Sequence, residues 1–130
     1  DLYLSMDIPV GDYKAFELDM NIVDEVQPCL VLFGTYTDNG ISHPFRVEWS
    51  SQMDLKFHPE TPFSLEKKKD YDLTVGVNVQ KLLNEQNWSL GTMTNENGVH
   101  TYVIRSGGQN DKLFMDIDED LQESLVLTIQ

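Results

Sequence analysis

The stretch from Tyr71 to Val79, with the sequence YDLTVGVNV, alternates apolar residues with small or polar ones over its whole length. The apolar residues hold every odd position, and a period of two is typical of a β-strand that buries one face. A half-buried strand needs a second layer to cover it. We therefore expect this stretch to be the central strand of a β-sheet protein.

Further apolar alternations predict strands on both sides of this stretch. We expect them at residues 2–6, 16–22, 29–37, 41–49, 53–57, 63–65, 99–104 and 124–130. A helix is predicted from Asn110, a good N-cap residue, because apolar residues recur after it at helical intervals: Leu113, Phe114, Ile117 and Leu121. Residues 80–87 predict only a helical turn. About eight short strands with one late α-helix predict a mainly β protein, a two-sheet antiparallel β-sandwich in a single domain spanning residues 1–130.

Two neighbouring strands carry more specific predictions. Cys29 to Phe33 is apolar throughout, which is typical of a strand buried on both faces. The pair Asn39-Gly40 suits the positive φ angles of a type I′ turn and predicts a hairpin between strands 29–37 and 41–49. Pro44 has no N–H to donate, so we expect that side of its strand to be an edge or a bulge.

The composition excludes some classes of partner. The chain of 130 residues has 22 acidic and 9 basic residues, and its formal net charge is −13. Nucleic-acid binding requires Lys and Arg to displace counterions, so this balance argues against nucleic acid and against an anionic membrane surface. Solubility is the simplest explanation of this acidity. The alternative explanation is that the protein binds calcium or a basic partner. No apolar run approaches the length of about 20 residues that spans a bilayer. The single cysteine, Cys29, lies in an apolar run, and we expect a buried, unreactive thiol.

The sequence motifs do not predict a catalytic or metal site. Asp116 to Asp120 places carboxylates at alternate positions, as a calcium loop does, but Leu121 and Leu127 stand where an EF-hand has Gly and Glu. The histidines lie on different predicted strands without the spacing of a zinc site: His43, His58 and His100. The sequence also has no nucleophile elbow and no glycine-rich phosphate loop. We predict a protein that is not an enzyme, with no catalytic residues, metal or cofactor.

Aromatic residues are the candidates for ligand binding. Trp49, Trp88, Tyr36 and Tyr102, together with Tyr3, can form an exposed platform for sugar rings or a partner protein. Amphipathic rings suit this role because they offer contact area at low entropic cost. The alternative is that each ring packs in the core or on a sheet face.

Several short motifs give the chain a resemblance to a family. They are IPVGDY at residues 8–13, GTY at 34–36 before the Asn-Gly hairpin, PFRV at 44–47, Trp88, and Asn110 followed by Leu113-Phe114. In this order they resemble the small secreted envelope lipoproteins of Gram-negative bacteria, whose function is unknown. The resemblance implies a transthyretin-like or immunoglobulin-like sandwich and a lipid anchor on a cysteine upstream of Asp1. It brings no catalytic residues.

Two functions are consistent with these observations. The first is a non-enzymatic, extracytoplasmic binding module in the cell envelope or at the surface, which recognises a glycan or a cell-surface protein through a sheet face or end loops. The second is a structural or assembly subunit, in which an edge strand pairs with a neighbour. The strand containing Pro44 and the terminal strands are the candidates for such an edge.

Overall fold

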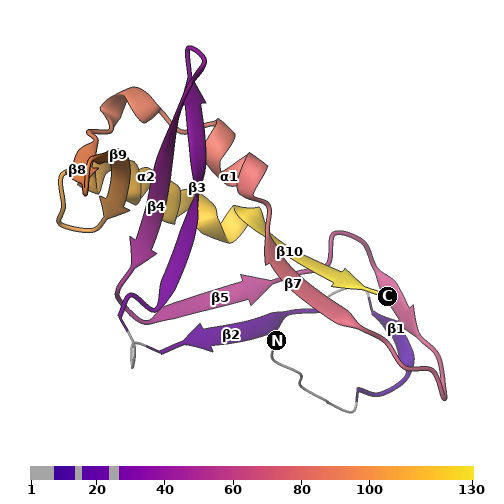
Figure 1. The fold of residues 1–130 in the computed structure, drawn as a ribbon. Helices are drawn as coiled ribbons and strands as arrows, with labels where there is room; N and C mark the ends of the chain where they lie inside the picture. Colours follow the sequence, from indigo (N-terminus) through magenta and orange to yellow (C-terminus); the bar gives the residue numbers. More distant parts are fainter. Residues whose placement is uncertain (1–7, 14–15, 24–26) are drawn as a thin grey trace.

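The computed structural model describes residues 8–13, 16–23 and 27–130. The fold is mainly β, with several sheets packed against one another and a late helix, consistent with the predicted sandwich (Figure 1). The predicted first strand, residues 2–6, lies outside the described residues, as does Tyr3.

The largest sheet in the described residues has four strands. Its order is β3 (Leu30–Asp38), β4 (Ile41–Trp49), β9 (Val99–Arg105) and β8 (Thr94–Glu96). The remaining strands form two-stranded ribbons: β1 (Gly11–Tyr13) with β6 (Phe63–Leu65), β2 (Leu18–Ile22) with β5 (Met53–Phe57), and β7 (Leu73–Val77) with β10 (Leu125–Ile129).

The β3–β4 hairpin is the one that Asn39-Gly40 predicts. Asn39 has a φ of 48° and Gly40 a φ of 80°, the positive angles of a type I′ turn. Its arms pair along their whole length, with Thr35 opposite Pro44 and Phe33 opposite Arg46. The tip of this hairpin projects beyond the rest of the fold (Figure 1).

Strand β4 is not the edge that Pro44 predicted, because β3 pairs with it on one side and β9 on the other. The second pairing is parallel and begins at Phe45, which lies opposite Tyr102. Pro44 therefore stands just outside the β4–β9 ladder, where its missing N–H leaves no bond unmade. At Pro44 itself, that side of β4 is unpaired among the described residues. The prediction of an edge therefore holds for the hairpin arm before Phe45 and is wrong for the rest of the strand.

Strand β7 confirms the alternation of the stretch around Val75 but not its central position. Leu73, Val75 and Val77 are half-buried, while Thr74 and Gly76 face solvent. Within the described residues β7 pairs only with β10. A period of two in hydrophobicity indicates that one face of the strand is buried. It does not indicate how many strands pair with it.

The core lies between the four-stranded sheet and the helices, and strands β5 and β10 also contribute buried residues to it. The described residues form four helical segments: α1 (Val79–Asn84), the short 3₁₀ helix η1 (Trp88–Leu90), α2 (Asp111–Leu121) and a second 3₁₀ helix, η2 (Gln122–Ser124). As predicted, α2 buries its apolar stripe, namely Leu113, Phe114, Ile117 and Leu121. These side chains pack with inward residues of the sheet: Phe45, Val47, Trp49, Tyr102 and Ile104.

Asn110 precedes α2 but does not cap it with its side chain. The side chain is only 1% exposed, and its amide bonds the loop and the sheet instead. Its Oδ1 accepts from the N–H of Thr92 at 2.6 Å, and its Nδ2 donates to the carbonyls of Thr92 at 2.9 Å and Val103 at 2.8 Å. The predicted N-cap is therefore an internal bracket that holds the segment before β8 against β9.

Candidate binding surfaces

The prediction that aromatic side chains form an exposed platform is wrong. Trp88 is 8% exposed, Tyr102 9% and Trp49 2%, while Tyr36 is half-buried. The Tyr36 and Trp88 rings stack with centroids 4.4 Å apart, and Tyr102 meets Trp88 edge-on at 5.5 Å. Burial, followed by the nearby Tyr36 and Asp38, raises the pKa of the Tyr102 hydroxyl. These rings form part of the core and offer little area to a ligand.

Trp49 lies apart from this stack, at the other end of β4. Its indole Nε1 donates to Asp118 Oδ1 on α2 at 2.8 Å, and its ring lies 5.8 Å from the ring of Phe114. A buried indole N–H needs a partner, and α2 provides it. Trp49 thus ties the sheet to the helix.

Strand β3 carries exposed apolar residues that were not among the predicted ligand-binding residues. Phe33 is 79% exposed and Val31 40% exposed. The burial of β3 alternates, with Leu30, Leu32 and Tyr36 half-buried on the inner side. The prediction of a strand buried on both faces is therefore wrong, because no layer of the described residues covers its outer face.

β3 is also an edge of the sheet. Among the described residues only β4 pairs with it, over nine residues from Leu30 to Asp38. The strand contains no Lys, no Arg and no Pro, and its only charge is Asp38 at its end. Natural edge strands are commonly short, charged, bulged or interrupted by proline, because a bare edge templates further pairing.

The backbone groups that face this free side follow from Pro44. In an antiparallel pair, hydrogen-bonded and non-hydrogen-bonded residue pairs alternate. Pro44 has no N–H, so its pair with Thr35 is a non-hydrogen-bonded one. The same alternation turns the N–H and C=O groups of Val31, Phe33 and Thr35 away from β4. A further strand would find these groups aligned along the edge.

The outer face of the same sheet carries a charged cluster beside Phe33. Arg46 Nε lies 2.5 Å from Glu48 Oε1, and its Nη1 and Nη2 lie 2.6 Å and 2.9 Å from the carboxylate oxygens of Glu96. These bonds, first to Glu96 and then to Glu48, raise the pKa of Arg46 further above its ordinary value. The Arg46 hydrogen bond also lowers the pKa of Glu96. The cluster links β4 to β8 across β9.

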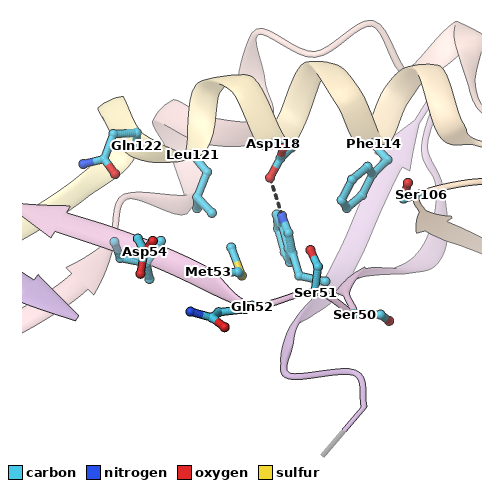
Figure 2. Close-up of a pocket in the computed structure, with 12 residues that line it drawn as sticks. Ser50, Ser51, Gln52, Met53, Asp54, Ser106, Phe114, Asp118, Leu121 and Gln122 are labelled. Atoms are coloured by element: carbon cyan, nitrogen blue, oxygen red, sulfur yellow. Dashed lines mark hydrogen bonds between the residues drawn. The ribbon is translucent and has the colours of Figure 1, made fainter. Parts of the chain in front are cut away.

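A cleft of about 540 Å³ lies between α2 and the segment from Trp49 to Leu55 (Figure 2). Buried Met53, Phe114 and Leu121 contribute its apolar lining, and polar side chains stand around it, among them Asp54 and Asp118. This cleft was not anticipated from the sequence. Its walls come from segments far apart in the chain.

The carboxylates of the Asp116–Asp120 run diverge, as a helix requires. Asp116 pairs with Lys112, Asp118 accepts from Trp49, and Asp120 Oδ2 accepts from Gln86 Nε2 at 2.8 Å. No group of His, Cys, Asp or Glu among the described residues is arranged to hold a metal ion. Nor does any helix of the described part of the chain have the length and apolarity to cross a membrane.

The chain matches no family model, no curated protein and no solved structure. A signal for the β3 surface was present in the sequence: Thr35 and Thr37 share the parity of Val31 and Phe33, and two polar residues on one face indicate exposure to solvent.

Proposed function

We propose that this protein is a non-enzymatic, extracytoplasmic binding module that takes an extended segment of a partner protein as an additional strand along β3. The observation that carries the proposal is the edge of β3 that no strand of the described residues pairs with. It is nine residues long and uncharged up to Asp38, and Phe33 on it is 79% exposed. Strand addition uses main-chain hydrogen bonds for affinity and alternate side chains for specificity.

Both sides of the added strand would find contacts. Its outward side chains would lie against Val31 and Phe33, which β3 exposes. Its inward side chains would cover Leu30, Leu32 and Tyr36, which remain half-buried. Burial of apolar area stabilises by about 25 cal/mol per Å², so this edge offers more than backbone bonds alone.

A glycan is less well supported as the ligand. Sugar recognition by stacking needs exposed ring faces, and Trp49, Trp88 and Tyr102 are buried. The extracytoplasmic location rests on the resemblance of the sequence to envelope lipoproteins. Metabolic labelling of the natural gene product with a radioactive fatty acid, followed by cell fractionation, tests that location.

The binding mode is tested with a displayed library of random decapeptides selected against the wild-type protein. Thr35→Pro removes one N–H from the free edge and leaves the β3–β4 bonds in place, whereas Thr35→Val is the matched control that keeps the N–H. We expect the selected peptides to bind the wild type and Thr35→Val alike and Thr35→Pro about tenfold more weakly. Far-UV circular dichroism and melting curves establish that both variants are folded.

Amide chemical shifts locate the peptide independently of the variants. We expect the largest changes at the N–H groups of Val31, Phe33 and Thr35. Peptides that bind Thr35→Pro as well as the wild type, peptides that perturb a different surface, or a selection that enriches nothing contradict strand addition. A wild-type dimer that Thr35→Pro converts to a monomer also contradicts it as stated, because the occupant of the edge would then be a second copy of the chain.

A further inference from the structure

The cleft between α2 and β5 is a second surface with a defined chemistry, separate from the edge of β3. Its volume of about 540 Å³ lies within the range of about 300 to 1,000 Å³ that small-molecule sites occupy. Met53, Phe114 and Leu121 line it with apolar atoms while remaining buried themselves. A methionine in such a lining adapts to ligands of different shape.

The charge of the cleft has one sign. Among the described residues, the charged ones that line it are Asp54 and Asp118, and none is Lys, Arg or His. The Lys56 side chain turns away, toward Glu17 on the segment before β2, with its Nζ 3.3 Å from Glu17 Oε1. Among the described residues neither Asp54 nor Asp118 forms an ion pair. An apolar lining with carboxylates that form no ion pair favours a cation that also has apolar surface.

Asp118 is held in a fixed position on the wall of the cleft. Its Oδ1 accepts from the buried Trp49 Nε1 at 2.8 Å, and Figure 2 shows this bond spanning from the helix to the indole. A carboxylate has about four acceptor sites, so one indole leaves capacity for further donors. Asp54 Oδ1 accepts from Asn21 Nδ2 at 2.5 Å, which likewise leaves acceptor capacity.

The two walls are joined at a further point. Gln122 Oε1 accepts from the backbone N–H of Lys56 at 3.2 Å, and Gln122 Nε2 donates to the carbonyl of Lys56. The Trp49–Asp118 bond joins the end of β4 to α2, and this pair of bonds joins β5 to Gln122, the residue that follows α2. The cleft is therefore formed before any ligand arrives, which lowers the entropic penalty of binding.

We propose that this cleft binds a small organic cation, a primary ammonium group on an apolar body. The ammonium would donate to Asp118 and the apolar body would lie against Met53, Phe114 and Leu121. A bare divalent cation suits the site poorly, because calcium takes six or more oxygen ligands and Met53, Phe114 and Leu121 offer none from their side chains. The proposal is independent of strand addition at β3, since the two surfaces share no residue.

The test is a titration of the whole protein with phenethylammonium, followed by amide chemical shifts and calorimetry. The neutral match, 2-phenylethanol, has the same ring and chain length without the positive charge. Asp118→Asn keeps an oxygen that can accept from Trp49 and removes the negative charge. Glu119→Gln removes the same charge from the exposed side of α2 and serves as the control for the general attraction of cations to an acidic protein.

We expect saturable shifts around Gln52, Met53 and Asp118 with phenethylammonium and binding at least about fivefold weaker in Asp118→Asn. Glu119→Gln should bind like the wild type, and 2-phenylethanol should bind at least about fivefold more weakly than the amine. Equal binding of the alcohol and the amine, equal losses in Asp118→Asn and Glu119→Gln, or shifts with calcium chloride alone would overturn the proposal.

Two further arms complete the experiment. If Asp118→Asn does not fold, Asp54→Asn and the comparison of alcohol with amine on the wild type still decide the outcome. A second probe, N-acetyl-lysine methylamide, distinguishes the source of the ammonium. Tighter binding of this probe than of phenethylammonium assigns the cleft to a lysine side chain of a partner, and the reverse order assigns it to a free amine.

Discussion

The two edges of the four-stranded sheet are built differently. On one edge β8 has three residues, Thr94–Glu96, and on the other β3 has nine. The carboxylate of Glu96 on β8 is held by Arg46 of β4, and Thr94 Oγ1 donates to Gln109 Oε1 at 3.2 Å. β3 has neither a basic residue nor a proline along its length.

This difference indicates which edge is available to a partner. A short strand with charged and hydrogen-bonded side chains discourages further pairing, and β8 has both properties. β3 lacks these features and exposes Phe33 and Val31 as well. An exposed, long, apolar edge is an aggregation site unless something covers it, so a natural protein that keeps one has a use for it.

The largest expected effect is the difference between two proline substitutions at neighbouring positions of β3, Gly34 and Thr35. Gly34→Pro removes an N–H that bonds to β4 and brings a ring against Phe45, whose ring atoms lie 3.0 Å from an added Cβ. We expect it to lower the free energy of unfolding by about 3 kcal/mol or more. Thr35→Pro acts on the free side and should change it by less than about 1 kcal/mol.

Urea denaturation of both variants measures this difference. Gly34→Ala is the control that separates the contact with Phe45 from the loss of the N–H. Equal losses for the two proline variants would show that the N–H of Thr35 bonds to β4. In that case the free edge would present the opposite set of backbone groups, and the comparison between β3 and β8 would lose its basis.

A smaller effect is expected at the bracket that supports the β8 side. Asn110→Ala leaves the N–H of Thr92 and the carbonyls of Thr92 and Val103 without their side-chain partner, which is itself buried. We expect a loss of about 2 kcal/mol in the free energy of unfolding, measured by urea denaturation. Thr94→Ala, on exposed β8, should stay within about 0.5 kcal/mol.

Asn110→Ser decides between two roles for this side chain. Serine is as good an N-cap as asparagine, so it should restore stability if Asn110 acts on α2. Serine is too short to reach Thr92 and Val103 together, so it should fail like alanine if Asn110 is a bracket. Recovery with serine would contradict the role that the three hydrogen bonds indicate.

Much of the fold could be predicted from the sequence because its signals are local. The alternation of β7, the Asn39-Gly40 turn and the apolar stripe of α2 each depend on a few neighbouring residues, and the structure confirms all three. The parallel pairing of β4 with β9 was not predicted. It joins residues far apart in the chain, and no short pattern records which strands become neighbours.

The candidate surfaces were harder to predict for the same reason. Whether Trp88 or Phe33 is exposed depends on what covers each ring, and hydrophobicity alone favours neither. Trp88 is covered by Tyr36 from the hairpin and by Tyr102 from β9. The cleft is beyond sequence reasoning altogether, because its walls, α2 and β5, are about sixty residues apart.

The smallest expected effect concerns the charge that links β8 to β4. The hydrogen bond from Arg46 lowers the pKa of Glu96, so the folded protein favours the ionised carboxylate. Its contribution to stability is present above the ordinary glutamate pKa of about 4.3 and is lost as the pH falls through the lowered value in the folded protein. Glu96→Gln cannot titrate there, so its melting temperature should fall less steeply with acid than that of the wild type.

Melting curves between pH 6 and pH 2.5 measure this difference, as a change in slope below about pH 4.3. Glu119→Gln is the control, because it removes a carboxylate from α2 and leaves the pair of Arg46 with Glu96 intact. Parallel curves for the wild type and Glu96→Gln would mean that the pair adds nothing to the stability of the fold. The features left to discourage further pairing of β8 would then be its short length and the hydrogen bond from Thr94 to Gln109, and lengthening that strand should make it more receptive to a partner.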